Sequence, residues 1–442
     1  MKNESKKSFW QKLPLDDYFV FYNKVLDAPI AQRLKLRELS EKFIYQGTKN
    51  GIKAGKSLGK IFQSSAKSPD RFSNKIPDDF FDLNYTDDQT LIQESVKEFA
   101  VALRAAAQEQ DEKKEISDEI WNAYNDLQLA YLQTPEALGG LSNEKSITTQ
   151  MLILETLAYG DLGQAYSLYS SNAVINALVE YGSEAQQTEL IPEYFKEEKL
   201  YAGIAINELQ PLFNPYQLTT TAIIEDEHFI LNGTKTLIPF GKKCQYFLIA
   251  AQLENGDNQL FMVDADQDGV TITDSEAMGL KSAQLSDIIL NNVRVHKSAQ
   301  LGEAGGIDYH RFIQMAKLGW CALAVGACQA VLDYVISYAN DRVAFGEPIS
   351  NRQAVAFMIA DMKIELDAMR ILTQRAVAQA EQGIDFMRAA YLAHVCCSDK
   401  SMQIGSNGVQ LLGGHGYIKD FPVERWYRDL RAVSIMYNSI HL

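Results

Sequence analysis

Several features that define common protein classes are missing from this 442-residue sequence. No run of about 18 apolar residues occurs, which argues against a membrane-spanning helix, and the start MKNESKKSFW has no apolar signal core. The six histidines lack ligand-like spacing, so we expect no structural metal. The five cysteines form no C-x-x-C pair. We therefore expect free, mostly buried thiols in a soluble protein of the reducing cytoplasm.

Positive charge is scarce outside the N-terminal part of the chain. Residues 1–76 contain 16 Lys and Arg and 7 Asp and Glu, a net charge of +9, whereas the whole chain has −15, which leaves −24 for the remainder. An acidic body repels phosphates and argues against nucleic-acid binding. Within residues 49–62, lysines and apolar residues fall on opposite faces of a predicted helix. Such a helix could contact an anionic membrane peripherally, or pack on the body or on a sister subunit.

Changes in apolar periodicity divide the chain into four predicted parts. Residues 1–83 form a basic helical extension, and residues 84–199 form a helical domain in which apolar residues recur at three and four. Over 200–303 the period becomes two, which predicts a β-barrel or β-sandwich. Helical periodicity returns over 304–442, with long helices near 307–341, 351–382 and 385–412. The predicted fold class is α+β, mostly α.

Three segments near the C-terminus carry the strongest functional signal. They read RVAFGEPISNRQ (342–353), VQLLGGHGYIKDFPVERWYRDLR (409–431) and SIMYNSI (434–440). In their sequence and order these segments resemble the C-terminal half of the acyl-CoA dehydrogenase family. That half carries the motifs R-x-x-F-G, Q-x-x-G-G-x-G-Y, P-V-E-R-x-x-R-D and Y-E-G-T. The resemblance covers about residues 84–442 and implies an N-terminal helical domain, a central β-domain and a C-terminal four-helix bundle. It also implies FAD-dependent α,β-desaturation of acyl-CoA by a homodimer or tetramer, with electron-transfer flavoprotein as a candidate electron acceptor.

The resemblance assigns the adenosine and diphosphate of FAD to five residues that act across a subunit interface: Arg342, Phe345, Gln410, Gly413 and Gly414. A guanidinium group and free backbone amides suit phosphates, and glycines allow a close approach of the backbone.

The segments expected at the flavin ring depart from the family pattern. The family's T-E-P-x-x-G-S-D reads NELQPLFN (207–214) here, and its W-I-T reads Leu237-Ile238-Pro239. Proline has neither the hydroxyl nor the N–H expected to meet the flavin N5 atom. We therefore expect a remodelled or abandoned pocket for the flavin ring.

The substrate residues and the base are also assigned by resemblance. Asp308 and Arg311 match a D-x-x-R motif that contacts the CoA side of the substrate. The glutamate of Y-E-G-T, which removes the substrate α-proton, is replaced by Asn438, which accepts no proton at neutral pH. Some relatives carry the base two residues after the aspartate, where this chain has His310. Histidine side chains can act as bases near neutral pH, so His310 is the candidate base, although a histidine at a helix start can also be structural.

Three interpretations of the function follow. The first, which we adopt, is an FAD-dependent acyl-CoA dehydrogenase with an altered base and flavin-ring pocket. The second is a flavin oxidase or monooxygenase on the same fold. The third is a non-catalytic paralogue that completes the FAD site of an active sister subunit through Arg342, Phe345 and Gln410.

Overall fold

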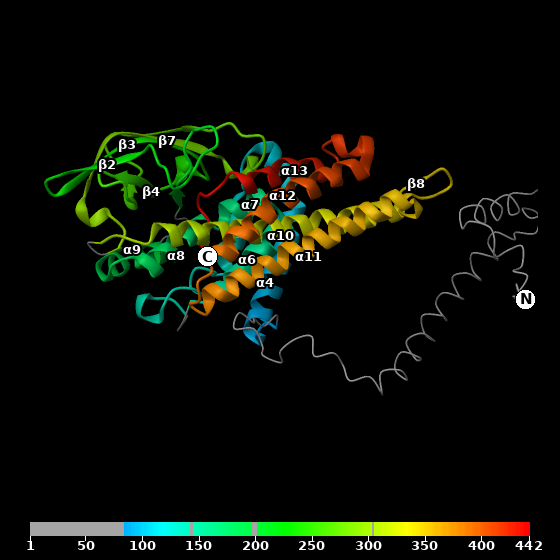
Figure 1. The fold of residues 1–442 in the computed structure, drawn as a ribbon, viewed down its shortest axis with the longest axis horizontal. Helices are drawn as coiled ribbons and strands as arrows, with labels where there is room; N and C mark the ends of the chain where they lie inside the picture. The colour runs from blue at the N-terminus through cyan, green and yellow to red at the C-terminus, as the bar shows by residue number, and fades with distance from the viewer. Residues whose placement is uncertain (1–83, 142–144, 197–200, 303–304) are drawn as a thin grey trace, which may run out of the picture. The chain divides into compact units, whose positions relative to one another are not determined.

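The structure is a computed structural model that describes residues 84–141, 145–196, 201–302 and 305–442. The predicted extension over 1–83, with its basic helix at 49–62, lies outside the described residues. The described chain is mostly helical with one curled sheet, which confirms the predicted fold class (Figure 1). The predicted domain borders near residues 199 and 303 fall in two undescribed segments and stay predictions.

The N-terminal helical domain is built around α6, which is buried along most of its length. Its elements are α4 (Asp87–Lys113), α5 (Asp118–Asp126), η2 (Glu136–Leu138), α6 (Ile147–Gly160), α7 (Leu162–Leu168), α8 (Ser170–Tyr181) and α9 (Glu184–Lys196). Thr86 begins α4 with a capping box, because its side chain accepts from the Gln89 N–H and the Gln89 side chain accepts from the Thr86 N–H.

The central domain is one seven-stranded sheet with the order β1-β4-β2-β3-β7-β6, and β5 pairs with β4. The strands are β1 (Ala202–Ala205), β2 (Thr221–Glu225), β3 (His228–Ile238), β4 (Tyr246–Leu253), β5 (Asn258–Asp264), β6 (Val270–Asp274) and β7 (Ser286–His296). The short helices η3 (Gly241–Lys243), η4 (Lys281–Ala283) and η5 (Lys297–Ala299) lie between or after them. Strands β1 and β2 run parallel to β4, and the remaining pairs are antiparallel.

The C-terminal domain contains three long helices, α10 (Tyr309–Asp341), α11 (Gln353–Glu381) and α12 (Met387–Leu412), and the short α13 (Val423–Asp429). A hairpin of β8 (Val343–Ala344) and β9 (Glu347–Pro348) with η6 (Ile349–Asn351) joins α10 to α11, and η7 (Gly413–Tyr417) and η8 (Leu430–Ser434) flank α13. Among the described helices, α10 is long and apolar enough to cross a membrane, but 78% of its apolar window is buried inside the protein. It is therefore the core helix. It approaches α6 closely because Gly326 has no Cβ, which would lie 1.9 Å from the Glu155 carbonyl oxygen.

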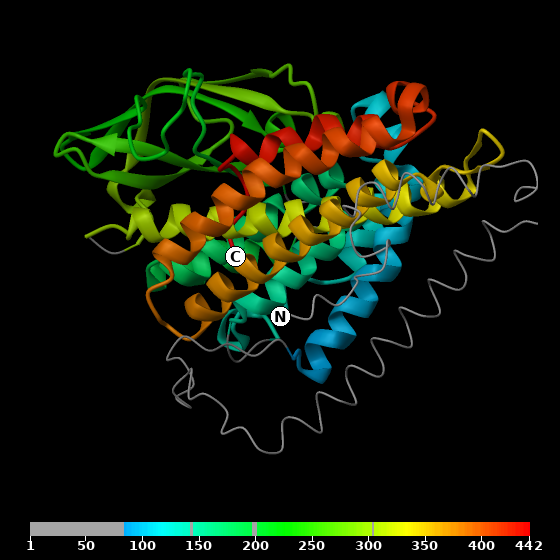
Figure 2. The ribbon, with the colours of Figure 1, turned by 45° about the vertical axis from the view of Figure 1, so that its right-hand side comes forward.

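The last residues of the chain lie between the β-domain and the helices. Figures 1 and 2 both show this red segment passing from α13 toward the green sheet.

All five cysteines are free thiols, as predicted from the sequence. Four of them are buried, and Cys396 is partly exposed.

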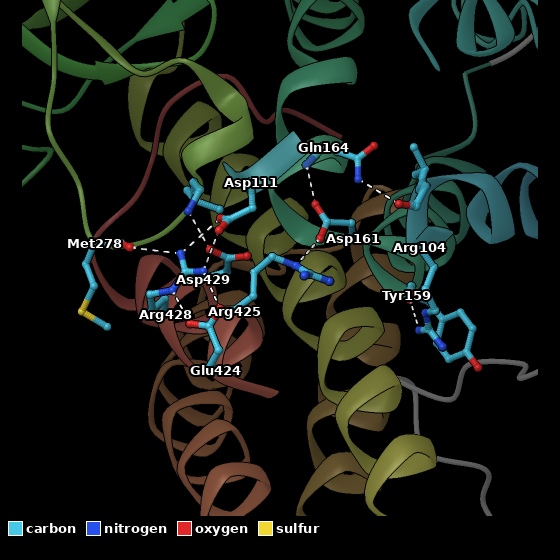
Figure 3. A network of polar contacts seen from close by, with 12 residues as sticks. Arg104, Asp111, Tyr159, Asp161, Gln164, Met278, Glu424, Arg425, Arg428 and Asp429 are labelled. Carbon is cyan, nitrogen blue, oxygen red and sulfur yellow. Dashed lines mark hydrogen bonds and ion pairs between the residues drawn. The ribbon is translucent and has the colours of Figure 1, made fainter. Parts of the chain in front are cut away.

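A network of buried charges joins the three domains beside α13 (Figure 3). Arg425 donates to Asp161, the N-cap residue of α7, with an Nε–Oδ2 distance of 3.1 Å. Arg428 contacts Asp111 of α4 at 2.8 Å and also pairs with Glu424. The P-V-E-R-x-x-R-D motif therefore serves as a structural tie here.

Asp429 connects the same network to the β-domain, because its Oδ1 accepts from the Leu280 N–H at 2.6 Å. Burial, followed by the nearby charge of Asp161, raises the pKa of Asp429 to about 7. Arg428 opposes this shift without cancelling it. The Asp429 carboxyl group therefore keeps its proton at pH values where an ordinary aspartate is ionised.

Candidate active site

A cleft of about 870 Å³ lies where the β-domain meets the C-terminal segment. It is bounded by residues 207–213, the end of β3, residues 275–278 and residues 434–437. Its apolar lining residues are Leu209, Pro211, Leu212, Phe213, Leu237, Ala277, Met278, Ile435 and Tyr437. The two segments predicted to surround the flavin ring therefore meet at one cleft.

A buried ion pair holds these two segments together behind the cleft. Lys235 of β3 donates to Glu208 at 2.8 Å, and both side chains are almost completely buried. Burial acts against the charged Glu208, but Lys235 and the Thr219 hydrogen bonds outweigh it and lower the Glu208 pKa to about 2. Burial also lowers the pKa of Lys235 to about 8, despite Glu208. The pair stays charged near neutral pH and fixes the cleft wall.

Asn438 joins the C-terminal segment to the same wall. Its Oδ1 accepts from the N–H groups of Ile206 and Asn207, at 2.7 and 2.8 Å. Its Nδ2 donates to the carbonyl oxygens of Thr236 and Leu237, at 2.7 and 3.2 Å. These four bonds use the full capacity of a buried amide. Asn438 therefore has a structural role in the described chain, because it ties the C-terminal segment to β3 and to the residues after β1.

The residues after Asn438 are completely buried. The Ser439 N–H donates to the carbonyl oxygen of Ile204 in β1, at 3.1 Å. Further along, Asn176 of α8 donates to the carbonyl oxygen of His441 at 2.9 Å. We name residues 438–442 the inserted segment, because it lies between β1, α8 and α10.

Glu180 lies beside the inserted segment and contacts three basic groups: Lys145 at 2.6 Å, Arg311 at 3.3 Å and His441 at 3.2 Å. Burial opposes its charge, but His441 and Lys145 hold its pKa well below the usual range. Arg311, the predicted CoA contact, is thus engaged with Glu180 and lies over the Phe386 ring.

Asp308 is the N-cap residue of α10, where its Oδ1 accepts from the Arg311 N–H at 3.0 Å. Its contact with CoA, and that of Arg311, stay predictions.

His310, the predicted base, lies on the exposed part of the first turn of α10. Its ring stacks on Tyr216, with centroids 4.6 Å apart. Farther along α10 lies Lys317, which the sequence analysis missed although it interrupts the apolar run FIQMAKLGWCALA (312–324). Lys317 is only 6% exposed, and its amine donates to the Tyr216 hydroxyl over 3.4 Å.

The five residues predicted to hold the nucleotide half of FAD are all exposed: Arg342, Phe345, Gln410, Gly413 and Gly414. Arg342 directly follows α10, and Gln410 lies in the last turn of α12. A hydrogen bond of 2.7 Å between Tyr338 and His415 brings these two helix ends together. A Cβ at Gly413 or Gly414 would meet no atom within 4 Å, so the space beside both glycines is open.

These residues fit the nucleotide half of FAD, because an exposed guanidinium group and an open glycine backbone suit a diphosphate. At the ring end, the cleft fits a flat apolar group by its volume and lining. Four backbone groups of its wall are already bonded to Asn438. The ring would therefore be held by shape and apolar contact more than by those groups.

Comparison with known proteins agrees with this architecture. The N-terminal, middle and C-terminal domains of acyl-CoA dehydrogenase match residues 86–198, 203–293 and 306–437. The chain is 32% identical to the probable acyl-CoA dehydrogenase FadE25 of Mycobacterium tuberculosis, over 74% of this chain and 86% of that protein. It is 30% identical to CarC, a subunit of the caffeyl-CoA reductase–Etf complex of Acetobacterium woodii, over 74% and 88%.

Among solved structures, butyryl-CoA dehydrogenase from Megasphaera elsdenii superimposes with a TM-score of 0.73 at 26% identity, covering 81% of this chain and 96% of that one. The chain belongs to the acyl-CoA dehydrogenase family. Members of this family are FAD-dependent oxidoreductases.

Proposed function

We propose that this protein is an FAD-dependent oxidoreductase that desaturates acyl-CoA thioesters with an altered base and flavin-ring pocket. The observation that carries the proposal is the mostly apolar cleft of about 870 Å³, placed where the two predicted ring-binding segments meet. An apolar lining of this kind can orient an acyl group beside a flat cofactor. The intact Glu208–Lys235 pair behind the cleft keeps that wall rigid.

FAD would be held by two separate groups of residues. Arg342, Gln410 and the Gly413–Gly414 backbone would hold the diphosphate of a flavin that lies partly in a second subunit. The cleft would hold the ring. When bound, FAD supplies an acceptor for a hydride from the substrate. The sequence similarity to CarC, a subunit of an Etf complex, supports electron-transfer flavoprotein as the partner that would reoxidise the FAD.

A homodimer, or a tetramer built from dimers, is part of this proposal. Phe357, Ile364 and Ile371 follow each other at intervals of seven along α11, and their side chains are 59%, 66% and 50% exposed. An apolar stripe of this spacing on one helix face is typical of helix packing between subunits. Such a dimer would also place the exposed Phe345 hairpin against the partner.

The side-chain amide of Asn438 has all its hydrogen bonds made within the protein, and this favours a second candidate function, the non-catalytic subunit. Asn438 takes four backbone groups of the cleft wall, and its position holds no acid. Such a chain would keep its exposed nucleotide-binding residues for the flavin of a sister subunit.

The absorbance spectrum of the purified protein, between about 300 and 550 nm where the flavin absorbs, tests these candidates. It is recorded with added FAD, before and after anaerobic addition of acyl-CoA thioesters. Bleaching of the flavin bands supports the dehydrogenase. A protein that retains no flavin supports the non-catalytic subunit. Bound flavin that no thioester bleaches supports an oxidase or monooxygenase.

A further inference from the structure

Lys317 is a buried amine without an acidic partner in the described part of the chain. Its only hydrogen bond there is the long one to Tyr216, and no carboxylate forms an ion pair with it. Burial lowers its pKa from the ordinary value of a lysine. A buried lysine without a counter-ion releases its proton readily and can serve as a base. Lys235 is the contrast, because its amine is bound to Glu208.

Three aromatic rings surround the Lys317 amine. Its Nζ lies 5.3 Å from the centre of the Tyr216 ring and 6.0 Å from the Tyr391 and Tyr437 rings. Ring faces attract a cation, so this cage stabilises the ammonium group when a proton arrives. The rings stabilise the ammonium group less than a carboxylate would, so the amine can still release its proton.

The other titratable groups around Lys317 do not supply a competing base. His394 of α12 is 8% exposed, and burial, followed by the charge of Lys317, lowers its pKa to about 4. Its Nε2 atom has no hydrogen-bond partner among the described residues. The thiol of Cys321, one turn along α10, has a pKa raised by burial. His310 is exposed and stacks on Tyr216.

Tyr437 connects the cage to the cleft. Its ring lines the cleft beside Phe213, with centroids 6.0 Å apart, and also faces Lys317 and His394. On α10, His310, Gln314 and Lys317 are spaced by four and three residues and therefore share one face. This face points toward Tyr216 and Tyr437. Tyr437 therefore contacts both the cleft and the surroundings of the Lys317 amine, which lies one ring away from the cleft lining.

We propose that Lys317 is the proton-accepting residue of this protein, in the role that the family glutamate would have. The inference rests on the proposed dehydrogenase function. The α-carbon C–H bond breaks, its proton forms an N–H bond with the neutral amine, and its electron pair becomes the new C=C bond. Bound FAD would supply the oxidant that accepts the β-hydrogen with its electron pair. The resulting ammonium group is stabilised by the tyrosine cage and later returns its proton to water.

The first experiment measures the amine itself and needs neither flavin nor substrate. Lysine labelled with ¹³C at Cε is incorporated, and the ¹³C shifts are followed by NMR as the pH rises. The signal absent from Lys317→Met belongs to Lys317. A midpoint clearly below the ordinary value of about 10.4 supports the proposal. A midpoint at or above that value overturns it.

The second experiment compares wild type, Lys317→Met and Lys317→Arg, with Lys242→Met as an exposed-lysine control. It measures flavin bleaching by acyl-CoA, exchange of the substrate α-hydrogen with deuterated water, and acyl-CoA affinity by calorimetry. We expect both Lys317 variants to bind the thioester and to lose bleaching and exchange by at least about 100-fold. Arginine keeps a long side chain that can form hydrogen bonds, but it stays protonated and accepts no proton.

Bleaching and exchange at the wild-type rate in Lys317→Arg would overturn the proposal. A wild-type protein that binds no flavin or leaves it unbleached would instead refute the dehydrogenase function, and the assignment of Lys317 with it. The rate of the wild type should also rise with pH up to the midpoint found by NMR. The same pH profile in a variant without the lysine would contradict the assignment.

Discussion

Ile440 lies directly against the backbone of Gly319 in α10: a Cβ added to Gly319 would come within 2.1 Å of the Ile440 Cγ2 atom. Both residues are fully buried. The missing side chain of Gly319 therefore provides the space through which the inserted segment crosses the core helix.

Gly319→Ala should displace Ile440 and lower the free energy of unfolding by about 1–3 kcal/mol, the usual cost of overpacking a core. Urea denaturation measures this difference. Ile440→Ala removes the clashing methyl group, so the same Gly319→Ala change should cost little in that background. An equal cost in both backgrounds would show that Ile440 does not fill this space.

Asn438→Asp keeps the shape of the side chain but replaces its NH2 group with an oxygen. At pH 8 the carboxylate would face the carbonyl oxygens of Thr236 and Leu237. We expect a loss of about 2–4 kcal/mol in the free energy of unfolding. At lower pH a protonated carboxyl group can donate again, and part of the loss should disappear. Wild-type stability of this variant at pH 8 would contradict the structural role of Asn438.

Asp429 should make the protein less stable as the pH rises from about 4 to about 7. Its folded-state pKa of about 7 lies above the ordinary value of 3.8, so the folded state holds the proton longer than the unfolded chain. The stabilisation is complete below the ordinary pKa and is lost as the pH passes the folded pKa, with a slope of at most about 1.4 kcal/mol per pH unit. Burial is the main cause of this raised pKa, and the charges of Asp161 and Asp111 add to it, whereas the Leu280 N–H and Arg428 oppose it.

Denaturation midpoints at pH 5 and pH 7.5 check this dependence, with Asp429→Asn as the matched variant. Asparagine still accepts from the Leu280 N–H but does not titrate. Wild type should lose more stability between the two pH values than the variant does. The same loss in both would exclude Asp429 as its source.

Ile364→Asp should convert the proposed dimer into monomers, because a charge in the middle of a buried apolar stripe is strongly unfavourable. Light scattering at micromolar concentration gives the mass. Lys363→Asp, one residue away and already exposed in its ion pair with Asp367, is the control that should stay dimeric. A wild-type protein that is monomeric would refute the dimer itself.

The fold was predictable because its signals are local. The helices expected near 307–341, 351–382 and 385–412 occur as α10, α11 and α12, within about two residues at each end. Apolar periodicity and caps such as Thr86 determine such elements from neighbouring residues.

The arrangement of the site was less predictable because its partners are distant in the sequence. The side chain of Asn438 is bonded to residues 206, 207, 236 and 237, and no pattern near residue 438 signals this. Arg311 was matched to a motif, but its pairing with Glu180 depends on how α8 packs against α10. Lys317 was visible as a charge in an apolar run, but only the structure shows the tyrosine rings around it.

The charge network in Figure 3 has a consequence for how the protein loses its structure. Asp111 and Asp161 come from the N-terminal domain, Leu280 from the β-domain, and Arg425, Arg428 and Asp429 from the C-terminal domain. If one domain opened alone, its charged groups would lose their partners in the other two domains, and these buried contacts would break together. We therefore expect the three domains to unfold together in a single transition, which calorimetry would show as one peak.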